Sequence, residues 1–242
     1  MLSTLILLSA LAAAPAAPYN EGNRLYAAED YAGAAAAYRR ALEAGPGAAA
    51  SYNLGNALFK SGHVGQAIVQ YRRAHYLEPR DADVQANLAF ARSYRADKVL
   101  TVAGPLAQAL DGAFHLLSRR EAALLAPAAF LLAALALSLW IVRRRTALLA
   151  AAIALGSLWL FGFVTERTWA AEVGARPAVV VVPEVDVLAG PDEDARHILL
   201  VHDGTEVRVR ERRGDYLLVQ LPGGGGGWLP QAAVEPVYEA GR

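Results

Sequence analysis

Two long apolar stretches near the middle of the chain set its predicted organisation. Residues 122–142 and 146–164 contain no charged side chain. A helix of 21 residues is about 31 Å long, which matches a bilayer core of about 30 Å. Only Arg143, Arg144 and Arg145 separate the two stretches. The pattern therefore predicts an antiparallel pair of transmembrane helices, with the buried helical pair of a soluble protein as the alternative.

The arginine link and the N-terminus both predict a topology. Three adjacent arginines are costly to translocate, so the link 143–145 is expected on the cytoplasmic side. Residues 1–17 are apolar and end in small residues around Ala14-Pro15-Ala16, as a secretory signal peptide does, although an uncleaved apolar N-terminus is the alternative. Both features place residues 18–121 and 165–242 on the periplasmic side of a bacterial inner membrane.

Between the first apolar run and the helical pair, the sequence repeats itself with an offset of 33 residues. The matched pairs are Gly22 and Gly55, Ala34 and Ala67, Tyr38 and Tyr71, Ala41 and Ala74, and Pro46 and Pro79. This pattern resembles the tetratricopeptide repeat, in which small residues let two helices approach closely and prolines end the second helix. We expect an α-helical domain over 18–98, with two repeats and a final capping helix from Asp83 to about Tyr94.

Stacked repeats of this kind form a shallow surface that binds peptides or partner helices. By repeat position this surface carries four asparagines, Asn23, Asn53, Asn56 and Asn87. Asn23 and Asn53 match the asparagine pair that holds a ligand carboxylate in peptide-binding members of the family. The third helix departs from that pattern, because Asp83 would repel a carboxylate. Hydrogen bonding between repeats, or simple solvation, is the alternative role of these amides.

After a linker at 99–121 and the helical pair, the hydrophobic pattern changes to a period of two residues. Five short strands separated by turn residues predict a small all-β barrel over 175–239, which resembles the bacterial SH3-like fold. Glycines 223–227 are expected to form a flexible hairpin turn. Tyr216, Trp228 and Tyr238 are the candidate binding aromatics, and the alternatives are general protein docking or a structural role.

The composition excludes several classes of function. Net charge is +0 and the chain has no cysteine, which argues against nucleic-acid binding and excludes thiolate catalysis and Cys-ligated metals. The histidines have no metal-binding spacing, and neither a nucleophile elbow nor a phosphate loop is present. The two apolar stretches contain no ionisable residue, which argues against a transporter. We therefore expect no enzyme activity, no metal and no cofactor.

The order of these parts is more specific than any one of them. A signal peptide, repeats with Asn53-Leu54-Gly55-Asn56-Ala57 and Tyr71-Arg72-Arg73-Ala74, a helical hairpin and an SH3-like module together resemble the BatE family of bacterial aerotolerance operons. The resemblance implies a membrane scaffold that works with von Willebrand A-domain Bat proteins and indirectly with a MoxR-type ATPase. The alternative function is an envelope protein whose SH3-like module docks on peptidoglycan.

Overall fold

The computed structural model describes residues 16–97 and 104–238. These residues belong to two compact units, one drawn from Met1–Leu100 and Ala175–Arg242 and the other from Thr101–Gly174. The predicted signal peptide, residues 1–17, lies almost wholly outside the described residues.

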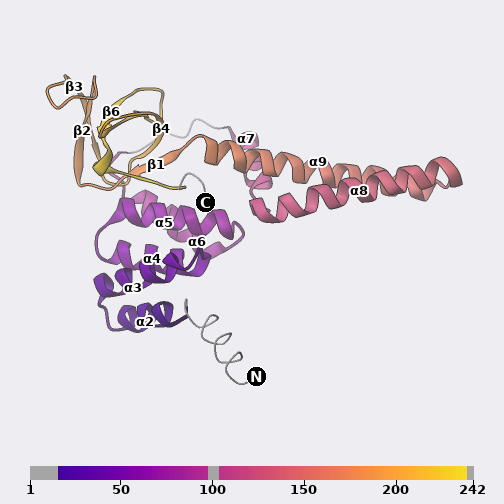
Figure 1. Cartoon of the computed structure of the whole chain (residues 1–242), viewed down its shortest axis with the longest axis horizontal. Coiled ribbons are helices and arrows are strands. Elements are labelled where there is room, and N and C mark those ends of the chain that lie inside the picture. Colours follow the sequence, from indigo (N-terminus) through magenta and orange to yellow (C-terminus); the bar gives the residue numbers. More distant parts are fainter. Residues whose placement is uncertain (1–15, 98–103, 239–242) are drawn as a thin grey trace, which may run out of the picture. The chain divides into compact units, whose positions relative to one another are not determined.

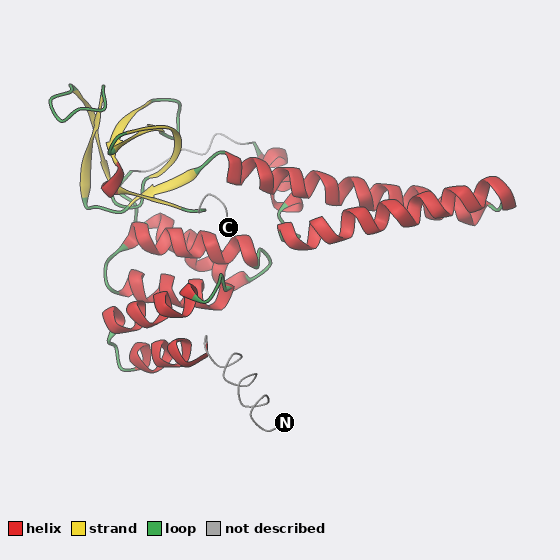
Figure 2. Ribbon diagram, viewed as in Figure 1, coloured by secondary structure: helices red, strands yellow, loops and turns green. Residues whose placement is uncertain are grey.

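The N-terminal part of the first unit is helical (Figures 1 and 2). Its described helices are α2 (Ala16–Ala27), α3 (Tyr31–Glu43), α4 (Ala48–Lys60), α5 (Val64–Leu77) and α6 (Ala82–Ser93). Each packs against the next along the chain. The 33-residue period survives in the structure, since α3 begins at Tyr31 and α5 at Val64. The described residues thus form five consecutive helices, and their assignment to two tetratricopeptide repeats with a capping helix stays a prediction.

Local sequence explains where these helices begin and end. The Asp30 side chain accepts a hydrogen bond from the Gly33 N–H at the start of α3, and Asp81 accepts from the Asp83 and Val84 N–H groups at the start of α6. Such caps satisfy the N–H groups that the first turn of a helix leaves free. Pro79 follows α5 by two residues, where a helix cannot continue.

The β module forms a single antiparallel sheet (Figure 2). Its strands are β1 (Pro177–Val180), β2 (Glu184–Leu188), β3 (His197–His202), β4 (Glu206–Arg213), β5 (Tyr216–Gln220), β6 (Gly226–Pro230) and β7 (Val234–Pro236). Their order in the sheet is β3-β2-β6-β5-β4-β1-β7. The described residues thus hold seven strands where the sequence predicts five, and β3 and β7 are the two end strands.

The glycine stretch 223–227 accounts for part of this difference. Gly223 and Gly224 have positive φ and form the turn, but Gly226 and Gly227 are strand residues that pair with Gln220 and Val219. A Cβ on either strand glycine would overlap a backbone carbonyl oxygen, that of Val219 or Leu188. The prediction of one long flexible turn is therefore wrong for the last two glycines, which are required by close packing of strands.

The helical repeats and the sheet share a hydrophobic core. Val179 of β1 and Val237, just after β7, are fully buried within the same cluster as Leu54, Ile68 and Tyr71 of the repeat helices. Burial of this apolar surface favours the association of the two parts by roughly 25 cal/mol per Å². The repeats and the sheet are therefore packed as one body in the first unit.

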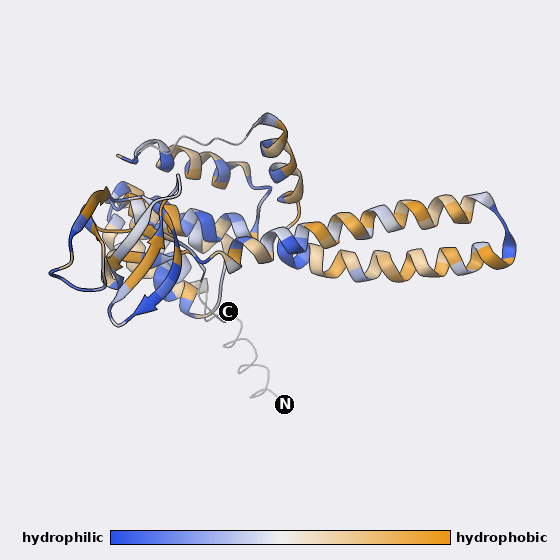
Figure 3. Cartoon of the chain, turned by 90° about the horizontal axis from the view of Figure 1, so that it is seen from above, coloured by the Kyte–Doolittle hydropathy of each residue, from blue (hydrophilic) through white to orange (hydrophobic). Residues whose placement is uncertain are grey.

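The second unit contains three helices in its described part: α7 (Pro105–Phe114), α8 (Arg119–Arg143) and α9 (Thr146–Gly174). Helices α8 and α9 are long and apolar enough to cross a membrane, and Figure 3 shows hydrophobic residues along both. Small side chains line their contact, where Gly162 faces Ala126, so the two backbones approach closely. Large apolar side chains such as Leu131 and Ile153 remain exposed, as suits lipid contact rather than a buried helical pair.

The helical pair differs from the prediction at both ends. Arg143 is the last residue of α8, so only Arg144 and Arg145 form the link, with Arg144 in the left-handed conformation. Helix α9 continues ten residues past Val164, the predicted end. The extension is held by Trp169, which is fully buried and donates its indole N–H to the Leu117 carbonyl oxygen at 2.8 Å. The hydropathy pattern did not predict this extension, because the charged residues Glu166 and Glu172 end the apolar run on which the prediction was based.

Candidate functional site

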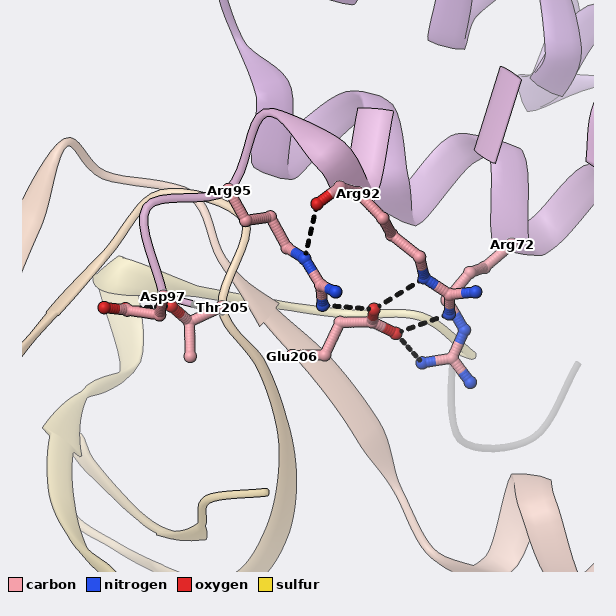
Figure 4. Close-up of polar contacts among 6 residues, drawn as sticks. All are labelled: Arg72, Arg92, Arg95, Asp97, Thr205 and Glu206. Carbon is pink, nitrogen blue, oxygen red and sulfur yellow. Dashed lines mark hydrogen bonds and ion pairs between the residues drawn. The ribbon is translucent and has the colours of Figure 1, made fainter. Parts of the chain in front are cut away.

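A cluster of ion pairs joins the helical repeats to the sheet at Glu206 (Figure 4). Glu206 is the first residue of β4, and its side chain is 17% exposed. Arg92 of α6 donates from Nε at 2.8 Å and from Nη2 at 2.9 Å, one bond to each carboxylate oxygen. Arg72 of α5 adds a bond at 3.1 Å, and Arg95 adds one at 2.9 Å. One carboxylate from the sheet is thus shared by three guanidinium groups from the repeats.

These contacts set the charge of Glu206. Burial alone would raise its pKa, but the hydrogen bond and charge of Arg92, together with the charges of Arg72 and Arg95, lower the pKa below its ordinary value. The carboxylate is therefore ionised at neutral pH, which charge-assisted hydrogen bonds require. Its removal would leave three clustered cations without their shared counter-ion.

A second carboxylate also connects the repeats to the sheet, and this one comes from the repeats. We call the contacts of Glu206 and of this carboxylate the Glu206 joint. Asp97, just beyond α6, accepts from the Thr205 hydroxyl at 2.5 Å (Figure 4). It also accepts from the His202 backbone N–H at 2.9 Å. The His202 imidazole Nδ1 lies 3.1 Å from the other oxygen. Burial opposes ionisation of Asp97, but the bonds from Thr205 and His202 outweigh it and lower the pKa. Asp97 therefore holds the β3–β4 turn against the end of the repeat helices.

The start of α5 makes a third connection. The Gly65 N–H bonds both oxygens of Asp203, at 3.0 and 3.1 Å. A Cβ at Gly65 would overlap the Val180 carbonyl oxygen and the Asp203 carboxylate. Further along α5, Arg73 donates to the carbonyl oxygens of Pro236 and Val237, both at 2.8 Å. The repeats and the sheet are therefore coupled along two helices, and the sequence offered no local signal that would have found these residues.

The four predicted asparagines lie in two matching networks. The Asn23 carboxamide oxygen accepts from the Tyr38 hydroxyl at 2.8 Å and from Asn53 at 3.3 Å, and Asn53 also bonds the Tyr19 hydroxyl at 3.0 Å. One repeat later, the Asn56 oxygen accepts from Tyr71 at 2.8 Å and from Asn87 at 2.9 Å, and Asn87 also bonds the Tyr52 hydroxyl at 3.0 Å. The structure thus places these amides in hydrogen bonds between repeats, and their binding of a peptide stays a prediction.

These networks give the repeats an expected alkaline sensitivity. Burial raises the pKa of Tyr38 to about 12 and raises that of Tyr71 as well. Because the folded-state values lie above those of the unfolded chain, the stabilising contribution is complete below pH 10 and is lost as pH rises through the folded values. We expect the Tyr38→Phe/Tyr71→Phe variant to show a shallower loss of stability above pH 10 than the wild type.

The measurement for this prediction is the urea midpoint of the full chain in detergent as a function of pH. Tyr94→Phe is the matched control, because Tyr94 is 60% exposed. Parallel pH profiles for the wild type and the double variant would contradict the expectation.

An exposed aromatic cluster lies on the repeat helices. The rings of Phe59, Phe90 and Tyr94 contact one another with centroids 5.0 to 5.5 Å apart. Phe90 is 52% exposed and Tyr94 is 60% exposed. Exposed aromatics that are held rigidly by mutual contact are the side chains that dominate protein interfaces. Sequence periodicity gives no signal for this cluster, because Phe59 comes from α4 whereas Phe90 and Tyr94 come from the C-terminal end of α6.

The three predicted aromatics of the β module lie in three different environments. Trp228 is buried in β6 with the Arg213 guanidinium 5.2 Å from its ring centroid. Tyr238 packs on Tyr76 of α5 with ring centroids 5.0 Å apart. Tyr216 alone borders an open hollow of about 720 Å³, whose lining includes Asp186, Glu193, Arg212, Asp215 and Gln231. These contacts therefore do not favour a single groove in which all three aromatic side chains bind one ligand.

The predicted arginine link lies at the end of the helical pair in the second unit. Arg143, Arg144 and Arg145 are exposed, and the Arg144 guanidinium lies 5.2 Å from the Trp140 ring centroid. Cation–π contact at this point suits a polar link between apolar helices.

Comparisons with known proteins add no assignment to this geometry. No protein-family model matches the chain, and no curated protein matches it. Within the described residues, no group of three or more histidine or acidic side chains is placed to hold a metal ion.

Proposed function

We propose that this chain is a non-catalytic, membrane-anchored adaptor that binds protein partners through its helical repeats. The observation that carries the proposal is the aromatic cluster formed by half-buried Phe59 of α4, exposed Phe90 of α6 and exposed Tyr94 at the C-cap of α6. Such rings lose little side-chain entropy on binding and bury a large apolar area, so they make effective anchors for a partner. The repeats resemble tetratricopeptide units, which bind peptides and partner helices in this manner.

The Glu206 joint supports the same function mechanically. An adaptor holds two bound partners in a fixed relative orientation, and a flexible connection between its modules would not fix that orientation. Three arginines on one carboxylate, with Asp97 and Asp203 as further attachments, fix the SH3-like module to the repeats. The adaptor would therefore present both modules as one rigid surface.

The helices α8 and α9 supply the anchor in this proposal. The arginine link would remain in the cytoplasm, and both modules would lie on the periplasmic side of the inner membrane. The resemblance to the BatE family points to partners with von Willebrand A domains, and indirectly to a MoxR-type ATPase. A role in envelope stress tolerance fits an assembly function better than catalysis.

Copurification tests the proposal. We expect the full chain in detergent to retain a von Willebrand A-domain membrane protein, and Phe90→Ala/Tyr94→Ala to reduce the retained amount at least tenfold, as loss of an interface hot spot does. The matched control is Leu106→Ala/Leu110→Ala, because both leucines are exposed on α7. Equal retention by the two double variants would contradict a partner site on the repeats.

A second candidate function is docking on peptidoglycan, which the hollow beside Tyr216 favours. An aromatic ring among carboxylates and a glutamine offers both stacking and hydrogen bonds to amino sugars or peptide amines. The same purified chain separates the two functions, since cosedimentation with cell-wall sacculi that depends on Tyr216, and not on Phe90, would favour this alternative.

A further inference from the structure

The two end strands of the sheet, β7 and β3, differ in how far other described residues cover their open edges. An unpaired edge exposes backbone N–H and C=O groups that can pair with another strand, so proteins usually cover it or place charge or proline there. At β7, Arg73 donates hydrogen bonds to the carbonyl oxygens of Pro236 and Val237, and Pro236 itself has no N–H to donate. The repeats thus cover one edge of the sheet.

At β3, the described part of the chain covers one end of the edge. The His202 N–H is bonded by Asp97, and the His202 carbonyl oxygen accepts from the Thr205 N–H. The Asp203 N–H bonds the Pro183 carbonyl oxygen, on the side of β2, whereas the His202 N–H points away from β2 to Asp97. Backbone groups alternate in direction along a strand, so those of Leu200 point to the open edge. By the same alternation, the backbone groups of Ile198 also face the open edge. Ile198 lies where the pairing register between β2 and β3 shifts.

The side chains of this edge are apolar and exposed. Ile198 is 46% exposed, Leu199 39% and Leu200 44%. None of the three positions carries a charge that would discourage pairing. A run of three exposed aliphatic residues on a strand edge is the pattern that proteins avoid unless another strand covers it.

We propose that β3 pairs antiparallel with β3 of a second copy of this chain, around a twofold axis at Leu199. Around this axis, Ile198 faces the second copy's Leu200 and the two Leu199 side chains meet. The same register places Arg196, which is exposed, opposite His202. His202 lies against Asp97 and is paired across the sheet with Glu184. Each arginine would therefore lie near two carboxylates, and the twofold axis generates this arrangement at both ends of the pair.

Charge and symmetry favour a second copy over an unrelated strand. An isologous interface needs a surface that complements itself. Arg196, just before β3, lies at one end of this edge, and Asp97 and Glu184, both next to His202, lie at the other end. Because the N–H and carbonyl groups of His202 are already hydrogen-bonded, the edge available for pairing is a short segment centred near Leu199. The pairing uses no residue of the Phe59, Phe90 and Tyr94 cluster, so it stands apart from the proposed partner site.

Site-specific crosslinking tests the proposal, because the chain has no cysteine of its own. In the proposed register the two Leu199 residues form a non-hydrogen-bonded pair, whose Cα atoms are about 4.5 Å apart, within the range of about 4.4–6.8 Å for a disulfide. We expect the full-length Leu199→Cys chain in detergent, oxidised with diamide, to form a disulfide dimer at least tenfold faster than Arg210→Cys. Arg210 is exposed on β4 and serves as the matched control.

A second substitution separates this pairing from association through the apolar helices. Leu200→Lys in the Leu199→Cys background adds a charge to the edge, and we expect the crosslinking rate to fall at least tenfold. Leu106→Lys, at an exposed leucine of α7, should leave the rate unchanged. Far-UV circular dichroism checks that both variants are folded.

Three outcomes overturn the proposal. One is a Leu199→Cys rate equal to that of Arg210→Cys. Another is a rate that Leu200→Lys does not change, which would assign dimerisation to another surface. The third is a monomer by light scattering whose crosslinks appear only with a different protein, which would make β3 the site of a heterologous strand.

Discussion

Replacing Glu206 with glutamine is expected to open the joint between the helical repeats and the sheet. The variant leaves Arg72, Arg92 and Arg95 clustered without the carboxylate that all three contact. Removing one member of a buried ionic cluster costs about 3 kcal/mol, because the remaining charges stay desolvated and repel one another. Hydrogen exchange of α6 and β4 should therefore be about a hundredfold faster in the full chain.

The control for this variant comes from the same strand. Glu211→Gln removes an exposed ion pair with Arg213, and exposed pairs contribute little, so exchange should be nearly unchanged. The pH dependence is a further check. The folded-state pKa of Glu206 is lowered, so its contribution is present above the ordinary glutamate pKa and is lost as pH falls through the lowered value. The difference between wild type and Glu206→Gln should disappear in acid, and a pH-independent difference would contradict this account.

Substituting alanine for Gly55 is expected to destabilise the repeats by about 2 kcal/mol, as overpacking a filled core does. A Cβ at this position would lie 2.7 Å from Cε1 of Tyr71 and 2.8 Å from its Cδ1. The ring has little freedom to retreat, because Tyr71 is buried and its hydroxyl is bonded to Asn56 at 2.8 Å. This clash outweighs the gain of about 1 kcal/mol that alanine normally brings to a helix.

Chemical unfolding of the full chain, followed by far-UV circular dichroism, measures this effect. Gly112→Ala is the matched control, because Gly112 lies inside helix α7 and a Cβ there would meet nothing within 4 Å. Adding Tyr71→Leu to Gly55→Ala should recover part of the loss by removing the ring. If Gly55→Ala proves as stable as Gly112→Ala, the ring must be able to move and the packing argument is wrong.

Local patterns predicted much of the secondary structure. The apolar runs at 122–142 and 146–164 predicted α8 and α9, and the glycine, tyrosine and proline spacing predicted the helical pairs. These patterns work because helix periodicity and bilayer thickness act on residues that are near one another in the chain. The ends were less accurate. Helix α9 continues to Gly174 because Trp169 packs on a segment 52 residues away.

The candidate sites depended more strongly on tertiary structure. The sequence drew attention to Asn23, Asn53, Asn56 and Asn87 as a ligand surface, whereas the fold engages these amides with tyrosines and with one another. The Phe59, Phe90 and Tyr94 cluster appears only when α4 and α6 lie side by side. Repeat position indicates which face a residue occupies but not which neighbour will satisfy its side chain.

The sequence by itself determined the apolar helical pair, the 33-residue repeat of helices and the change to a β pattern after Gly174, since each follows from short-range periodicity. Only the tertiary structure decided that the repeats and the sheet form one body. Glu206 meets Arg72 across 134 residues and Arg92 across 114, and no local rule relates positions so far apart. Their pairing follows from the packing of Val179 and Val237 into the repeat core, which brings a buried carboxylate within reach of the arginines that keep it ionised.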